Sequence, residues 1–242
     1  MITLPTECIF EIFNNLQNYD GSLLYKSLFS CLLINRQWCR IIVPILWSNP
    51  ALCDKSFIRT CLLSLNSEEQ SSLIPFNIIL PKNSKPLFEY TSHITSINNN
   101  LSDGINDWLK NESHRFLNEP MNAIKCSLIS MFLRTSRKLK YLSFSGIIYN
   151  HIILAENISE NTTLISLNFS HNYLNSQERK LILLALSKNS SLTSLIFNDN
   201  QLDSEDGKIL EKVLSKNTLT SLSIVYGQLD SESGSESNSK GS

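Results

Sequence analysis

Apolar residues recur at helical spacing in three short runs at the start of the chain. Leu4-Pro5 followed by Glu7 predicts a helix start, because proline is tolerated in a first helical turn and an early acidic residue suits the helix dipole. Turn residues at 18–22 interrupt the pattern, Asn35 is a suitable N-cap for the third run, and Pro44 should stop or kink it. The three apolar faces are Ile9, Ile12, Phe13 and Leu16; Leu24, Leu28, Cys31 and Leu32; and Trp38, Ile41 and Ile42.

Three short helices form a marginal core, and these runs carry more apolar side chains than such a core can cover. The surplus residues are Phe10, Phe29, Leu33 and Ile34. A unit this small usually gains stability from a neighbour, and an exposed apolar patch commonly marks an interaction site. The first fifth of the chain is therefore predicted to dock onto a partner.

The middle of the chain is the least regular part. Residues 49–72 predict a helix with Phe57, Cys61, Leu62 and Leu65 on one face, ended by the polar stretch 66–72. Residues 76–80 are a short apolar run between prolines and predict a strand, whereas 98–100 and 102–104 predict loops. A helix is expected from Glu119 or Pro120 to Arg134. Poor order is expected for 98–118, and 49–138 as a whole is either a helical connector or a set of degenerate repeats.

A repeated motif begins near residue 139. Leu164-x-x-Leu167-x-Phe169-x-x-Asn172-x-Leu174 recurs from Leu192 and again from Leu219, and a weaker copy starts at Leu139, with a period of about 25–28 residues. Leucine and phenylalanine alternate inward on a short strand, and the segments 180–189 and 208–217 predict helices that cover the same core. Asn172 and Asn200 are placed for their buried amides to bond the backbone of the turn between coils.

The first fifth of the chain resembles an F-box. The resemblance covers residues 2–48 and lies in the ordered series Leu4-Pro5-x-Glu7, Ser27-Leu28-x-x-Cys31, Asn35-Arg36-x-Trp38 and Leu46-Trp47. It implies that the segment binds a Skp-type linker protein, and through it the cullin of a ubiquitin ligase. The linker contacts that it implies are Leu4, Pro5, Ile9, Ile12, Leu28 and Leu32.

The repeats resemble leucine-rich repeats of the ribonuclease-inhibitor type over residues 139–229. The resemblance implies a short, right-handed α/β solenoid whose outward strand residues line a concave face. The expected organisation is an α/β chain with a three-helix F-box at 1–48, the connector or degenerate repeats at 49–138, leucine-rich repeats at 139–229 and a disordered tail at 230–242. The residues expected to contact a target protein are Tyr141, Asn168, His171, Ile196, Asp199 and Tyr226.

Composition excludes several function classes. The chain has 242 residues, a formal net charge of −1 and no arginine-rich run, which disfavours nucleic-acid binding. No secretory signal and no run of about 18–20 apolar residues is present, so we expect a protein of the cytoplasm or nucleus that does not cross a membrane. The six cysteines form no C-x-x-C pair and read as buried thiols. No catalytic, phosphate-binding or dinucleotide motif occurs, so neither enzymatic activity, a cofactor nor a bound metal is expected.

Two functional hypotheses follow. The first is a substrate-recognition adaptor of a cullin-based ubiquitin ligase, with a target protein held by the repeats. The alternative is a leucine-rich-repeat scaffold without ligase coupling, in which the first three helices only cap the exposed end of the solenoid. A third class, a small-GTPase regulator built on similar repeats, has little specific support in this sequence.

Overall fold

The computed structural model describes residues 4–16, 25–50, 54–81, 86, 88–111, 118–215 and 218–225. In this part, the chain is α/β, with five short parallel strands paired in chain order from β1 to β5. The register runs without a shift from β2 to β5, since one row of paired residues crosses these strands: Tyr141, Ser166, Ser194 and Ser221. The strands are β1 (Ser96–Ile97), β2 (Tyr141–Ser143), β3 (Ser166–Asn168), β4 (Ser194–Ile196) and β5 (Ser221–Ser223).

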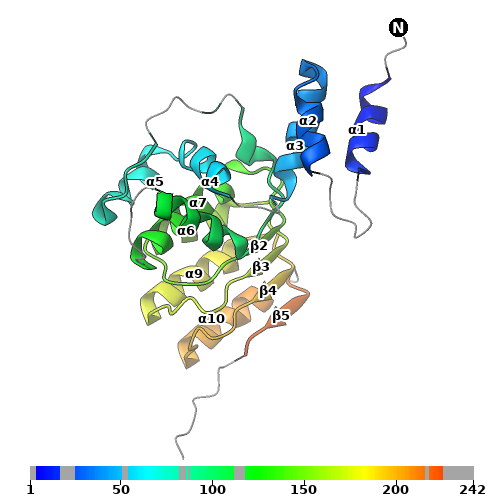
Figure 1. Cartoon of the computed structure of the whole chain (residues 1–242). Coiled ribbons are helices and arrows are strands. Elements are labelled where there is room, and N and C mark those ends of the chain that lie inside the picture. Colours follow the sequence, from blue (N-terminus) through cyan, green and yellow to red (C-terminus); the bar gives the residue numbers. More distant parts are fainter. Residues whose placement is uncertain are drawn as a thin grey trace, which may run out of the picture.

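Helices connect the strands and lie on one side of the sheet, which leaves the other face open (Figure 1). Successive helices α7, α8, α9 and α10 pack side by side. The parallel pairing needs such crossover connections, since a tight turn can join only antiparallel strands. We call this sheet with its helices the array. Its helices are α6 (Asn100–Asn111), α7 (Asn118–Thr135), α8 (His151–Glu160), α9 (Ser176–Lys188) and α10 (Ser204–Leu214).

Inward strand residues form the core of the array, as the alternation predicted. Leu167 and Leu195 are fully buried at paired positions of adjacent strands. Just beyond the strands, the rings of Phe169 and Phe197 stack with centroids 5.6 Å apart, and Phe144 meets Phe169 edge to face at 4.9 Å. Each coil of the array therefore buries its apolar face against the next coil.

Buried asparagines link successive coils at both ends of the strand–helix unit. After the strands, Nδ2 of Asn200 donates to the Phe169 carbonyl at 2.7 Å, which confirms the predicted amide–backbone bond. A second ladder, which the sequence analysis missed, lies after the helices. There Nδ2 of Asn189 donates to the Asn161 carbonyl at 2.7 Å, and Asn161 itself donates to the Leu133 carbonyl at 2.9 Å. The available signal was the sequence Leu186-Ser187-Lys188-Asn189 at the end of the segment 180–189, which recurs at 214–217.

The middle of the chain departs from several predictions. β1 pairs with β2, so the sheet extends into the segment 49–138. Residues 76–80 are not a strand: a 3-10 helix, η1 (Ile74–Phe76), ends at Asn77, whose φ of 53° breaks any extended run. The expected loop at 102–104 is wrong as well, because α6 passes through it with Leu101, Ile105 and Trp108 buried. The helix expected from 119 or 120 to 134 is confirmed by α7.

The polar stretch 66–72 is likewise a short helix, α5 (Ser67–Ser71), rather than a simple stop after α4 (Lys55–Leu62). Asn66 and Glu69 form a capping box at its start, a signature that the sequence contained. Glu69 is almost fully buried and accepts two hydrogen bonds from Arg134 at 2.8 and 2.9 Å. This ion pair ties α5 to the long central helix α7.

The first three helices form a small core of their own. α1 (Thr6–Asn14) and α2 (Tyr25–Leu32) both pack on α3 (Arg36–Ser48), and we call them together the three-helix unit. The predicted cap is confirmed: Asn35 accepts a hydrogen bond from the Trp38 amide at 2.8 Å. Pro44 does not stop α3, which continues to Ser48. Burial of Val43 and Ile45 on either side offsets the backbone hydrogen bond that proline forfeits.

The end of α3 joins this unit to the array. The carbonyl of Ser48 accepts hydrogen bonds from Thr95, from its amide at 2.6 Å and its hydroxyl at 2.7 Å. Within the array, the Thr95 carbonyl accepts in turn from Tyr141, so α3 supplies the acceptor at the start of the ladder. Trp47 stacks between Phe57 and Tyr90, with ring centroids 5.1 and 4.8 Å away. The η2 turn (Tyr90–His93) thus contributes to the junction.

None of the helices in the described ranges combines the length and apolar character that a membrane span requires. The longest of them, α7, carries charged residues at both ends.

Candidate functional site

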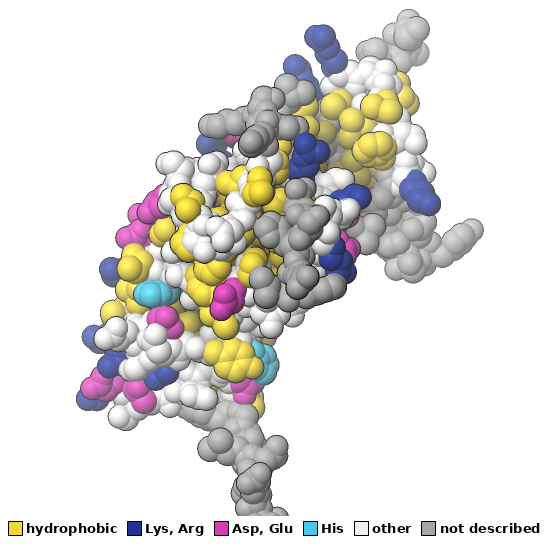
Figure 2. Space-filling view, turned by 60° about the vertical axis from the view of Figure 1, so that its left-hand side comes forward, with side chains coloured by type: hydrophobic (Ala, Val, Ile, Leu, Met, Phe, Trp, Pro, Cys, Tyr) yellow, Lys and Arg dark blue, Asp and Glu magenta, His cyan; other side chains and the backbone are white. Residues whose placement is uncertain are grey.

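The three-helix unit exposes apolar side chains on α1, α2 and the residues beside them. We call these residues the exposed apolar set: Leu4 (52% exposed), Phe10 (41%), Ile12 (51%), Phe29 (61%), Leu33 (77%) and Ile34 (60%). Hydrophobic side chains gather over this part of the molecule at the upper right of Figure 2. The predicted surplus is confirmed: Phe10, Phe29, Leu33 and Ile34 all remain in contact with solvent. Large apolar side chains that gather at a surface commonly mark a contact with another protein.

The structure divides the six predicted linker contacts. Leu4, Pro5 and Ile12 are exposed, and Leu32 is half-buried against the small core. Ile9 and Leu28 need correction, because they are 7% and 0% exposed and lie inside that core. They hold the helices together and cannot touch a partner while the unit is folded. On α2, the outward position next to Leu28 is occupied by Phe29.

The open face of the sheet carries short uncharged side chains. The first row across the strands is Tyr141, Ser166, Ser194 and Ser221, and the second is Ser143, Asn168, Ile196 and Ser223. Of the predicted target contacts on these rows, Tyr141 is 52% exposed, whereas Asn168 and Ile196 are half-buried. Because serine side chains are short, the backbone of another chain can approach these rows closely. The exposed Tyr141 can contact such a chain with its apolar ring and its hydroxyl group.

The loops that follow β3 and β4 bring two more predicted contacts together. Nδ1 of His171 lies 3.3 Å from a carboxylate oxygen of Asp199. Both residues have positive φ angles, 57° and 55°, and Tyr173 and Gln201 repeat this conformation at 47°. Left-handed backbone at non-glycine residues is costly and is held in place by the surrounding structure. Tyr173, 77% exposed, was missed by the sequence analysis, whereas Tyr226 lies outside the described residues.

Side chains at this face already have hydrogen-bond partners within the chain. The side-chain Oδ1 of Asn198 accepts from the backbone N–H of Val225 at 2.9 Å, and the side-chain Oδ1 of Asn168 accepts from the Ser170 hydroxyl at 2.8 Å. These amides hold the loops in shape. The face can therefore bind a partner by shape and by hydrogen bonds from its serine hydroxyls.

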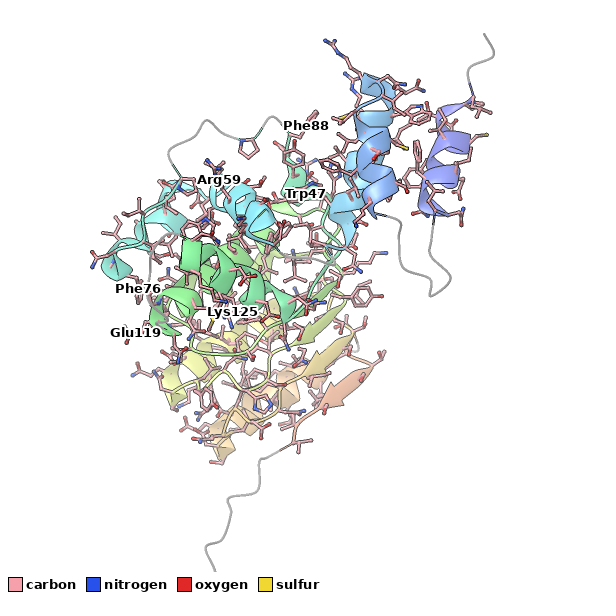
Figure 3. The ribbon with its side chains drawn as sticks, in the orientation of Figure 1. Trp47, Arg59, Phe76, Phe88, Glu119 and Lys125 are labelled. Atoms are coloured by element: carbon pink, nitrogen blue, oxygen red, sulfur yellow. The ribbon has the colours of Figure 1, made fainter. Side chains whose placement is uncertain are left out.

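The titratable groups inside the array have structural partners. Burial lowers the pKa of Lys125, whose ammonium donates to the Ser145 carbonyl at 2.6 Å. Burial also raises the pKa of the Cys126 thiol to about 11, so this thiol stays protonated at neutral pH. In Figure 3, Lys125 extends from α7 inside the array, away from Trp47 and Phe88 at the junction. The pair positions the loop at Gly146 rather than forming a reactive site.

The predicted thiol burial holds only in part: Cys61 and Cys126 are buried and Cys31 and Cys39 are half-buried, but Cys8 is exposed. Cys53 lies outside the described residues. No group of three or more potential metal ligands occurs among the described residues.

Comparison with known proteins adds no assignment. No protein-family model matches the chain, and a search of curated proteins found no match.

Proposed function

We propose that this protein is a substrate-recognition adaptor of a cullin-based ubiquitin ligase. In this proposal the three-helix unit is an F-box that binds a Skp-type linker, and the array is a leucine-rich-repeat solenoid that holds a target protein. The observation that carries the proposal is the exposed apolar set, since a unit that served only as a cap would have no use for it.

The two cores of the molecule support this division of labour. Ile9, Phe13 and Leu28 are buried within the three-helix unit, in a cluster separate from the core of the array. The unit can therefore keep its own shape while Phe29 and Ile12 face a partner. The mechanism would be proximity: a bound target is held near the ubiquitin-charged enzyme, which raises the effective concentration of its lysines.

Co-expression with a Skp-type linker tests the proposal. The wild-type chain should capture the linker at one-to-one stoichiometry, and Ile12→Asp combined with Phe29→Asp should weaken capture by roughly a hundredfold. Each of two anchor residues at an interface typically contributes more than 1 kcal/mol, and a buried charge adds its own penalty. Leu28→Asp is unsuitable for this test, because Leu28 is 0% exposed and its loss would unfold the unit.

Ile79→Asp is the matched control. Ile79 is 65% exposed but belongs to the segment after η1, away from the three-helix unit. It should capture the linker as the wild type does. If the wild type captures no linker, or if the Ile12/Phe29 pair and Ile79→Asp behave alike, the adaptor proposal fails.

The alternative function, a repeat scaffold capped by the three helices, has one specific observation in its favour. The Ser48 carbonyl supplies the acceptor that an earlier coil would offer to Thr95. Deleting residues 1–48 does not separate the two proposals, because it removes Trp47 and Ser48 from the junction in either case. Linker capture does: a scaffold with an unused cap binds no linker, whatever its stability.

A further inference from the structure

A cavity of about 930 Å³ lies where the three-helix unit meets the array. Its walls come from α2, α3, α4 and the residues 88–90. Small-molecule sites typically enclose about 300–1,000 Å³ and combine apolar walls with a few polar groups. The size therefore suits one small organic ligand.

The walls are apolar and largely aromatic. On α3, Cys39, Val43 and Trp47 recur every four residues and form one stripe facing the cavity, while the opposite side of that helix packs in the small core. Trp47 is sandwiched between Phe57 and Tyr90. Figure 3 shows Trp47 and Phe88 at this junction, between the array and the first helices. A wall of flat rings and branched side chains suits the hydrocarbon or aromatic part of a ligand.

Three donors that line the cavity have no partner among the described residues, whereas the hydroxyls of Ser30 and Thr60 donate to backbone carbonyls of their own helices. Lys26 on α2 forms no ion pair within the described residues, and neither the Tyr90 hydroxyl nor the Trp47 indole N–H forms a hydrogen bond there. Burial raises the pKa of Tyr90, and the nearby Cys39 adds to the effect, so the hydroxyl stays protonated. Among the described lining residues the one carboxylate is Asp54, which already caps α4 by accepting from the Phe57 amide at 2.8 Å. The free polar groups thus suit an acceptor that carries negative charge.

We propose that this cavity binds an amphipathic organic acid, with its apolar body against Trp47 and Val43 and its carboxylate at Lys26. This goes beyond the adaptor function, because the site is separate from target binding on the sheet. Since α2 and α3 form one side of the cavity and α4 the other, the bound acid also holds the three-helix unit against the array.

Isothermal titration with decanoate, below its micelle-forming concentration, tests the proposal on the full chain. The expected result is one molecule bound per chain, tighter than decan-1-ol. Lys26→Met should weaken decanoate by about two- to fivefold, the range for an exposed ion pair, and leave decan-1-ol unchanged. Decanoate should also slow maleimide labelling of Cys39, with the exposed Cys8 as the internal reference.

Two filling variants and one control locate the site. Thr60→Phe on α4 and Ser30→Phe on α2 place a ring in the cavity from opposite walls, and each should abolish binding with an unchanged far-ultraviolet circular dichroism spectrum. Leu33→Ser changes an exposed residue just after α2, outside the cavity lining, and this variant should bind decanoate normally. No binding by the wild type, or binding that survives both filling variants, would overturn the proposal. Phe29 also lines the cavity, so Ile12→Asp alone, whose residue lies outside the lining, tests linker capture independently of decanoate binding.

Discussion

Asn200→Ala should destabilise the protein more than Asn172→Ala, although both asparagines hold the same position of the repeated motif. Both are almost fully buried, at 2% and 1% exposed. Asn200 donates to the carbonyls of Phe169 at 2.7 Å and Asn198 at 3.1 Å, and its oxygen accepts from the Asn172 amide at 3.3 Å. The Asn172 side chain donates to the Ser170 carbonyl at 3.1 Å, within its own coil, and its oxygen has no partner among the described residues.

The difference follows from the groups that each substitution leaves unpaired. A hydrogen bond contributes about 1 kcal/mol net, and a buried group left without a partner costs about 1–3 kcal/mol. Asn200→Ala leaves the Phe169 carbonyl and the backbone N–H of Asn172 without a partner and should lower the free energy of unfolding by about 3 kcal/mol. Asn172→Ala should lower it by about 1 kcal/mol. The same atoms are deleted in both variants, so the contribution of the lost volume is similar and cancels in the comparison.

Urea unfolding followed by circular dichroism measures the difference. With a slope of about 2–3 kcal/mol per molar urea, a difference of about 2 kcal/mol separates the two midpoints by roughly 0.7–1 M. The slope itself should not change, because neither variant alters the surface exposed on unfolding. Equal midpoints, or a lower midpoint for Asn172→Ala, would refute the role assigned to the cross-coil bonds.

Four further substitutions test other parts of the structure. Trp47→Ala should lower the free energy of unfolding by about 3 kcal/mol and speed tryptic cleavage at the junction, because a ring stacked on both faces is lost; an unchanged melting temperature would contradict this. Gly146→Ala should cost about 1–3 kcal/mol, since φ is 115° and the new Cβ would lie 2.7 Å from Oδ1 of Asn122. At Gly207 the new Cβ would meet no neighbouring atom within 4 Å, so Gly207→Ala should instead stabilise α10 by about 0.5–1 kcal/mol. If the two glycine variants shift the melting temperature in the same direction, this explanation of both positions is wrong. The pKa of the Asp203 carboxyl is lowered, mainly because the backbone N–H of Asp206 donates to its charged form. The charged carboxylate therefore stabilises the fold above the ordinary aspartate pKa, and this stabilisation is lost as pH falls below about 4. Asp203→Asn keeps the cap and should flatten the fall in melting temperature between about pH 4 and 2; an equally steep fall would exclude this residue as its source.

Parts of the fold could be predicted because their signals are local. The helix at Asn118–Thr135 was expected within one or two residues, and the alternation around Leu167 and Leu195 correctly placed both side chains in the core. The exposure of Phe29 and Leu33 also followed from simple counting, since three short helices cannot cover so many apolar residues.

Other parts were missed because composition concealed the pattern. Gly104 and its polar neighbours suggested a loop, yet Leu101, Ile105 and Trp108 carried helical spacing through the same stretch. Asn77 broke the apolar run at 76–80 by adopting a left-handed conformation, which hydrophobicity alone does not indicate. The junction cavity was not anticipated, because it is built from segments far apart in the chain.

Periodicity and residue identity by themselves determined that this chain alternates short strands with helices and places leucine, phenylalanine and asparagine at matched positions of successive coils. Such patterns specify which side chains share a face of one element, because helix and strand geometry are local. Only the tertiary structure decided what each face meets. Leu28 is buried while its neighbour Phe29 faces solvent, α3 continues through Pro44, and Trp47 lies between Phe57 and Tyr90. Contacts between distant segments settle these outcomes, and their energies outweigh the local preferences that the sequence displays.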